Sequence, residues 1–162
     1  MRIRDAVPAD APAACDVLIR SITVLCAGDH RNDPAILSRW LANKTPENVA
    51  AWIALPDRSF LLATAGQAVL GVGAVTDIGE ITLNYVAPEN RFRGISKSLI
   101  AALEARAAHR GAARLHLHST GTARRFYRSA GYADDGEPTN LFGLSGFPMS
   151  KPLPTSRSPP GP

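Results

Sequence analysis

The sequence contains few cysteines, no long apolar run and no glycine-rich nucleotide motif. Its two cysteines, Cys15 and Cys26, do not form a CxxC pair and lie outside any histidine cluster, so we expect buried thiols rather than a disulfide or a metal site. The uncharged runs are too short or too polar to span a bilayer, and the opening MRIRDAVPAD lacks the apolar stretch of a signal peptide. We therefore expect a cytoplasmic protein that binds neither membrane nor metal.

Two common phosphate-binding patterns are also missing, because neither GxGxxG nor GxxxxGK[ST] occurs after a predicted strand. What is present is the composition of an ordinary globular chain: 162 residues, of which 45% are hydrophobic and 20% are charged. We expect one domain over residues 1–153. The Pro/Ser-rich tail, residues 154–162, has a composition typical of disorder.

The hydrophobic periodicity predicts a mixed α/β (α+β) fold. Helices are expected to begin at Asp10, Asp33 and Thr45, with CAGDHRN (26–32) interrupting the first. A further helix is expected from the apolar stripe Leu99, Ile100, Leu103 and Ala107, which ends at Gly111, and a last one over about 122–130. Strands are expected at 1–7, 60–64, 68–75, 80–87, 113–118 and 147–153. The middle three strands read as an antiparallel meander, and the loop before the last strand is longer than packing alone requires.

Positive charge is concentrated in one segment. Residues 91–128 contain nine Lys or Arg and one acid, whereas the whole chain carries a net charge of only +4. Such a field suits nucleic acid or a polyanionic small ligand, but the segment has few aromatics and no nucleic-acid motif. A solvated helix face accounts for Arg106 and Arg110. It accounts less well for the cations at the start of the segment, which are Arg91, Arg93 and Lys97.

The stretch NRFRGISKSLI (90–100) places these cations directly before an apolar helical pattern. Free main-chain N–H groups at a helix start carry a positive partial charge, and Gly94 allows a ligand to approach the backbone closely. The stretch therefore predicts a phosphate site.

Two motifs carry a resemblance to a known family. LNYVAPENRFRGISKSLIAALEARA contains R-x-x-G-x-S between a strand and a helix, and ARRFYRSAGY follows a helix and a strand later. Together they resemble the GCN5-related N-acetyltransferases, which transfer an acetyl group from acetyl-CoA to an amine. The resemblance implies a mostly antiparallel mixed sheet of six to seven strands, flanked by four to five helices, with a splayed strand pair that holds acetyl-CoA.

The resemblance also implies which residues bind the co-substrate. The pyrophosphate would lie against Arg91, Phe92, Arg93, Gly94, Ile95, Ser96 and Lys97. The pantetheine arm and acetyl carbonyl would pair with a bulged strand at Asn84, Tyr85 and Val86. Ser96 replaces the usual Gly or Ala of the motif, and Thr120 stands where many members have an asparagine that contacts CoA.

Acetyl transfer to an amine needs a base for the amine and an acid for the leaving thiolate. Glu80 matches the catalytic glutamate of the histone-acetylating branch, although a solvated turn glutamate would look the same in sequence. His116 and His118 are the alternative bases, because imidazole titrates near neutrality. Tyr127 matches the tyrosine that protonates the CoA sulfur in many members.

The acceptor is expected to be a small-molecule amine, bound by the early helices and the loop 134–146. Asp29, His30, Asp33 and Trp40 are the candidate acceptor contacts, since acids at the mouth would suit a cationic amine. No nucleic acid is expected as a partner, and homodimers are common in the family. The alternative function is a non-catalytic acyl-CoA sensor, which would keep the phosphate loop but could lose Glu80 and Tyr127.

Overall fold

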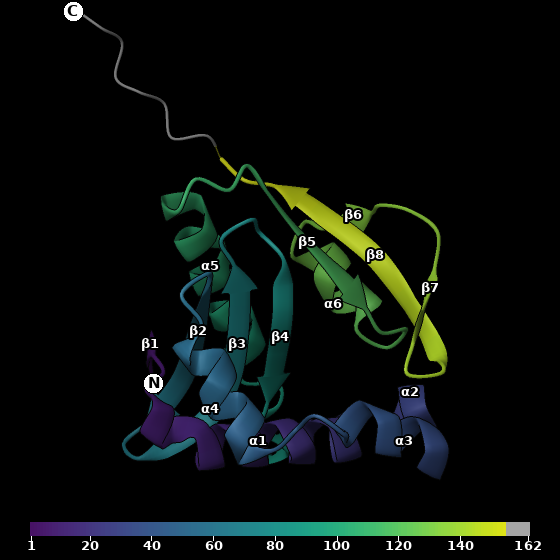
Figure 1. Ribbon diagram of the computed structural model, residues 1–162. Helices are drawn as coiled ribbons and strands as arrows, with labels where there is room; N and C mark the ends of the chain where they lie inside the picture. Colours follow the sequence, from purple (N-terminus) through teal and green to yellow (C-terminus); the bar gives the residue numbers. More distant parts are fainter. Residues whose placement is uncertain (155–162) are drawn as a thin grey trace, which may run out of the picture.

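The computed structural model describes residues 1–154, so all but the first residue of the predicted disordered tail lies outside the described residues. Two sheets lie side by side (Figure 1). The first has the order β1-β2-β3-β4 and is antiparallel throughout. Its strands are β1 (Arg2–Asp5), β2 (Arg58–Ala65), β3 (Ala68–Thr76) and β4 (Ile81–Val86). The second has the order β5-β8-β6, with β7 also paired to β8. Its strands are β5 (Arg114–Ser119), β6 (Ala133–Asp134), β7 (Thr139–Leu141) and β8 (Leu144–Pro152).

Two helices, α3 and α4, begin where the sequence offers both a side-chain cap and an early proline. The Asp33 carboxylate accepts from the N–H groups of Ala35 and Ile36, and the Thr45 hydroxyl accepts from Asn48 N–H. The α-helices are α1 (Ala11–Arg20), α2 (Ala27–His30), α3 (Pro34–Leu41), α4 (Pro46–Ala54), α5 (Ile95–His109) and α6 (Arg124–Ser129). Short 3₁₀ turns occupy Pro8–Asp10 and Pro88–Asn90.

The first helix extends further than the sequence indicated. A π-helical turn, Ser21–Leu25, continues α1 nearly to α2, so CAGDHRN contains a short helix rather than a plain interruption. His30 stabilises this turn, because its fully buried ring places Nε2 3.0 Å from the Ile22 carbonyl and 3.2 Å from the Thr23 carbonyl. The local sequence CAGDHRN suggests that the helix breaks, because it does not reveal that the His30 ring contacts the carbonyls of the preceding turn.

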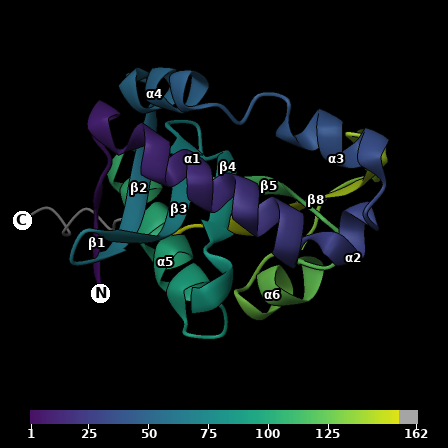
Figure 2. The same ribbon diagram turned by 90° about the horizontal axis from the view of Figure 1, so that it is seen from below.

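Both faces of the first sheet are covered. Figure 2 shows α1 and α4 on one face and α5 on the other. The α5 face buries Leu99 and Leu103, and the α1 face buries Leu18 and Val72. Gly71 in β3 permits the close approach of α5, because a Cβ there would lie only 2.8 Å from Leu99 Cδ1.

The junction between the two sheets determines where a ligand can bind. β4 and β5 are linked by one parallel bridge between Glu80 and His116, where His116 N–H donates to Gly79 O at 2.9 Å. Beyond it the strands diverge (Figure 1). The pairing of β3 with β4 shifts between Ala74↔Leu83 and Val75↔Ile81, so Thr82 is the extra residue of a β-bulge. The splayed, bulged strand pair implied by the resemblance is therefore present.

The loop predicted over 134–146 is partly ordered as a hairpin. β7 pairs with β8 so that Leu141 lies opposite Leu144, and the two connecting residues, Phe142 and Gly143, both have positive φ. This is the geometry of a type I′ turn, for which Asn-Gly is the usual sequence signal. Because Phe142 occupies the first turn position in place of asparagine, the sequence does not predict this hairpin. Over residues 1–154 the fold contains eight strands and six α-helices, and the predicted α+β class is confirmed.

Candidate active site

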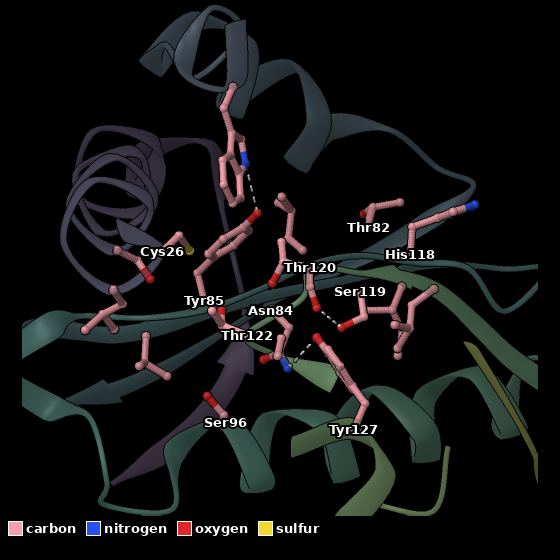
Figure 3. A pocket seen from close by; sticks show the side chains of 18 residues that line it. Cys26, Thr82, Asn84, Tyr85, Ser96, His118, Ser119, Thr120, Thr122 and Tyr127 are labelled. Carbon is pink, nitrogen blue, oxygen red and sulfur yellow. Dashed lines mark hydrogen bonds between the residues drawn. The ribbon is translucent and has the colours of Figure 1, made fainter. Parts of the chain in front are cut away.

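A cavity of about 230 Å³ opens where β4 and β5 diverge (Figure 3). Side chains from six segments line it: the π-helical turn with Cys26 after it, α3, β4, the start of α5, β5 with the loop after it, and α6. Asn84 and Tyr127 face each other across the cavity, and Asn84 Nδ2 donates to Tyr127 Oη at 3.2 Å. The sequence had nominated both residues, and the fold brings them into contact.

The polar atoms of this pair are available to a ligand. Asn84 Oδ1 is buried and has no hydrogen-bond partner among the described residues, which is costly unless a donor arrives. Because Tyr127 Oη accepts from Asn84, its own hydrogen is free to be donated elsewhere. Burial raises the pKa of Tyr127, although the hydrogen bond from Asn84 lowers it in part, so the phenol keeps its proton at neutral pH.

The loop 91–97 forms a second cavity, which shares Val86 and Ser96 with the first. Gly94 is the N-cap of α5 with φ +76°, and no side chain caps the helix there. A Cβ at Gly94 would meet nothing within 4 Å, so the backbone faces open space. The first N–H groups of α5 have no intrahelical acceptor, and they are therefore positioned to bind an anion.

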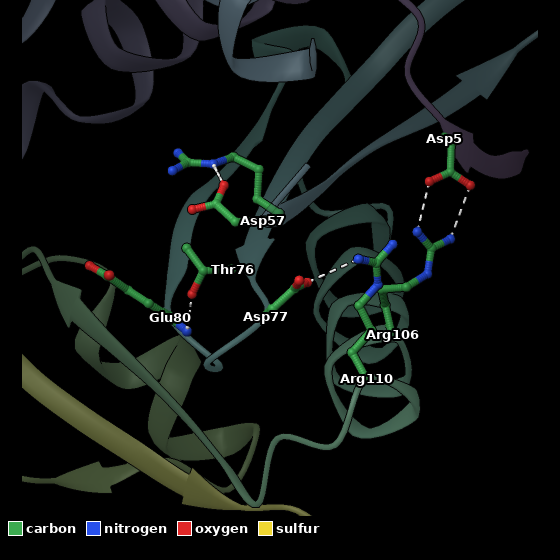
Figure 4. A network of polar contacts seen from close by, with 8 residues as sticks. Asp5, Asp57, Thr76, Asp77, Glu80, Arg106 and Arg110 are labelled. Atoms are coloured by element: carbon green, nitrogen blue, oxygen red, sulfur yellow. Dashed lines mark hydrogen bonds and ion pairs between the residues drawn. The ribbon is translucent and has the colours of Figure 1, made fainter. Parts of the chain in front are cut away.

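The cations around the basic segment divide into two groups. Arg106 and Arg110 form ion pairs with Asp5 and Asp77 at 2.7 Å and 3.0 Å (Figure 4). No ion pair occurs for the three cations of the loop within residues 1–154; these are Arg91, Arg93 and Lys97. The two paired arginines connect α5 to Asp5 and Asp77 within the fold, whereas the loop cations are available to bind a polyanion.

Glu80 lies at the point where the two sheets meet. Its N–H donates to Thr76 Oγ1 at 3.0 Å, and its carboxylate points away from the Asp77 and Arg110 pair in Figure 4. It lines a cavity of about 240 Å³ that adjoins the first and shares Thr82, Leu83 and His118 with it. Tyr127 does not line this cavity, and Glu80 does not line the first, so the two residues belong to different cavities that adjoin along β4.

The two candidate histidines are placed differently. His118 lines both cavities, whereas His116 lines neither and holds the bridge to Glu80 through its backbone. Thr120, which replaces the family asparagine, also lines both cavities.

This geometry agrees with the comparisons to known proteins. A family model described as "Acetyltransferase (GNAT) domain" matches residues 29–153. The chain belongs to the GNAT acetyltransferase family. The family is one of acetyltransferases, so acetyl transfer is the general chemistry to which the chain belongs.

Solved structures show the same fold. A GCN5-related N-acetyltransferase from Rhodopseudomonas palustris is 26% identical with a TM-score of 0.83, over 94% of this chain and 95% of that one. A PaiA N-acetyltransferase from Thermoplasma acidophilum, solved with coenzyme A, is 20% identical with a TM-score of 0.78, over 94% and 98%. A ribosomal-protein-alanine N-acetyltransferase from Brucella melitensis is 24% identical with a TM-score of 0.73, over 94% and 100%. No curated protein sequence matched the chain.

Most of the residues nominated for the acceptor pocket of this GNAT protein have structural partners. Asp29 accepts from both the backbone N–H and the hydroxyl of Thr122. His30 is engaged at both nitrogens, since Nδ1 also accepts from Asn32 N–H. Asp33 caps α3. Among these four nominated residues, only Trp40 lines the cavities around β4, where its ring stacks on Phe142 at 6.0 Å between centroids.

Lys44 also lies at this site, although no pattern in the sequence singled it out. It follows α3, is only 8% exposed, and lines the Glu80 cavity. Burial lowers the pKa of its ammonium from 10.5 to about 8. A lysine in NKTPEN looks like any surface lysine, because its burial depends on the hairpin that folds over it.

Cys26 lines the first cavity, and Cys15 is buried in the core. Burial, with a smaller contribution from Asp29, raises the pKa of the Cys26 thiol to about 12. A thiol protonated at neutral pH is a poor nucleophile. Within residues 1–154 no cluster of metal-binding side chains is present, and none of the helices has the length and apolar character needed to cross a membrane.

Proposed function

We propose that this protein transfers the acetyl group of acetyl-CoA directly to the amine of a small molecule. The observation that carries the proposal is the continuous path from the unpaired cations of the 91–97 loop, along β4, to the Asn84–Tyr127 pair. Acetyl-CoA would supply a thioester-activated acetyl group, and residues of this chain would bind it and provide the acid and the base of the reaction.

We propose that the 91–97 loop binds the pyrophosphate through its free N–H groups and its cations. The main chain of Asn84, Tyr85 and Val86 would pair with the pantetheine arm, because β4 is released from β5 along these residues. The orphaned Asn84 Oδ1 supports this assignment, since pantetheine contains amide N–H donors that could satisfy it.

Tyr127 is proposed as the acid. Its hydroxyl hydrogen is free and its raised pKa keeps it protonated, so it can donate to the thiolate as the C–S bond breaks. Asn84 is proposed to orient the hydroxyl by donating to its oxygen.

Glu80 is proposed as the base on the acceptor side of β4, acting directly or through one water. His118 remains the alternative base, because it lines both cavities. No covalent enzyme intermediate is proposed, since the Cys26 thiol is held protonated.

Binding of acetyl-CoA at the loop can be tested with two glycines of the same helix. Gly94 and Gly111 flank α5, both have positive φ, and both have open space where a Cβ would lie. Gly94→Glu and Gly111→Glu should therefore cost similar backbone strain, but only Gly94→Glu places a side chain and a negative charge at the pyrophosphate. Calorimetry should show at least a tenfold loss of acetyl-CoA affinity in Gly94→Glu alone. Equal affinity in the two variants would place the co-substrate elsewhere.

Activity is tested by screening amines with detection of the released CoA thiol. Turnover with any amine separates an enzyme from the acyl-CoA sensor, which would bind acetyl-CoA tightly and release no thiol across the whole screen.

A further inference from the structure

Lys44 is a buried cation without an acidic partner. Its Nζ donates to Asn43 Oδ1 at 2.8 Å and to Trp40 O at 3.3 Å. An ammonium has three donors, so one N–H remains. No carboxylate pairs with Lys44 within the part of the chain that the structure describes, and the rings of Trp52 and Phe142 lie 5.9 Å and 5.8 Å from Nζ.

Capping of α3 explains only part of this arrangement. A lysine can contact the last carbonyls of a helix from the surface, where water solvates the charge. Burying an unpaired ammonium is costly, and buried charges in proteins are normally paired. The position of Lys44 therefore calls for an anion that is not part of the described chain.

Two cavities meet at Lys44. The Glu80 cavity shares Lys44, Thr82, Leu83 and Phe142 with a further cavity of about 310 Å³. That cavity is lined by the aromatic rings of Trp52, Phe60 and Phe142 and by polar side chains that include Asn43 and Arg58, and Arg58 pairs with Asp57 at 3.2 Å. Lys44 is thus a buried cation where two cavities with both aromatic and polar walls meet beside β4.

The same space also carries the opposite charge. Glu80 is the carboxylate of the Glu80 cavity, whereas Lys44 lies where that cavity meets the next. An amine held near Glu80 and the acetyl group would rest its apolar body against Trp40, Leu83 and Phe142, and a carboxylate on the carbon that bears the amine would be directed to the ammonium of Lys44. A simple cationic amine would leave Lys44 unpaired, and a polyamine would place a second cation against it.

Building on the proposed function, we propose that the acceptor is an amino carboxylate with an apolar body, such as an apolar amino acid, whose carboxylate pairs with Lys44. The carboxylate would complete the hydrogen bonding of the ammonium, and the aromatic rings would exclude water from the pair. Acids at the mouth, which sequence reasoning had linked to a cationic amine, are instead engaged in the fold at Asp29 and Asp33.

The test compares acceptors that differ only in the carboxylate. Phenylalanine, phenylalaninamide and phenethylamine form one set, and leucine, leucinamide and isopentylamine form another. For wild type, kcat/KM should be at least tenfold higher for the amino acid than for the amine in at least one set. In Lys44→Met this preference should fall to within about twofold of unity, and Lys44→Arg should restore part of it. Arg125→Met is the matched control, because it removes an exposed cation outside the cavities and should keep the preference.

Folding is checked separately by circular dichroism and by acetyl-CoA affinity, which should be unchanged in Lys44→Met. A preference for the decarboxylated amine in both sets would overturn the inference, and so would a preference that survives Lys44→Met. Acetylation of other amines in the screen, without turnover of either amino acid, would also overturn it while leaving the N-acetyltransferase proposal intact. Absence of turnover with every amine would instead reject the proposed function.

Discussion

The pH dependence of folding stability should reveal the cost of burying Lys44. In the unfolded chain Lys44 titrates near 10.5, and in the folded protein burial lowers its pKa to about 8. Between these values the unfolded state binds more protons than the folded state, so the free energy of unfolding of wild type rises with pH. Below pH 8 the full penalty is present. In the Lys44→Met variant no group titrates at this position, so the contribution of Lys44 to the increase of the unfolding free energy with pH is absent.

The size of the effect follows from the same shift. A change from 10.5 to about 8 corresponds to about 3 kcal/mol between the two protonation states. Because solvent reaches part of the ammonium through the cavities, we expect about 1–3 kcal/mol to be observed. The difference in unfolding free energy, wild type minus Lys44→Met, should increase by this amount from pH 7 to pH 10.5.

Urea unfolding of both proteins across this pH range measures the difference directly. Other titrating groups, including the nearby Cys15, occur in both proteins and largely cancel. Lys151→Met is a useful comparison, because Lys151 is paired with Glu104 at 3.0 Å and its removal should destabilise the fold already at neutral pH. A difference for Lys44→Met that stays flat with pH would refute the argument that Lys44 is buried as a cation against its ordinary preference.

Two further predictions concern the chemical step. Tyr127→Phe should lower kcat by roughly ten- to a thousandfold while acetyl-CoA affinity is kept; Tyr132→Phe is its control, because that hydroxyl donates to Glu104 at 3.0 Å outside the cavities. Wild-type turnover in Tyr127→Phe would remove it as the acid. Glu80→Gln should lower kcat near neutral pH, with a deficit that shrinks as pH rises because more of the amine is already deprotonated. A deficit independent of pH would indicate that Glu80 positions the amine, and His118 would be tested next.

The order of elements could be predicted from the sequence because each depends on local signals. Proline after Asp33 and Thr45 sets two helix starts, and the meander of β2, β3 and β4 follows from apolar runs separated by turns. The 91–97 loop could be singled out as a candidate because its cations and glycine are adjacent in the chain. The family resemblance nominated Asn84 and Tyr127 separately, and their contact was not predicted, since 43 residues separate them in the chain.

Features that depend on distant contacts were not predictable in this way. The π-helical turn exists with His30 folded back on it, and Lys44 is buried beneath a hairpin nearly a hundred residues later in the chain. The acidic residues at 29 and 33 looked like a binding surface, but a helix cap and a loop anchor use the same residue types. Sequence shows which groups are present, and only the fold shows which of them already have partners.

The bulge at Thr82 determines which side chains of β4 face each side of the strand. A regular strand would point alternate residues to opposite faces, but the extra residue restarts the alternation, so that Ile81 and Asn84 face the α5 side while Leu83 and Tyr85 face α1. Thr82 and Leu83 line all three cavities: the one that contains Tyr127, the one that contains Glu80 and the further one that contains Arg58. The same segment of β4 therefore borders the proposed acid, the proposed base and the proposed anion site. An acetyl group held against that segment would lie between groups from these cavities, which is the arrangement that direct transfer requires.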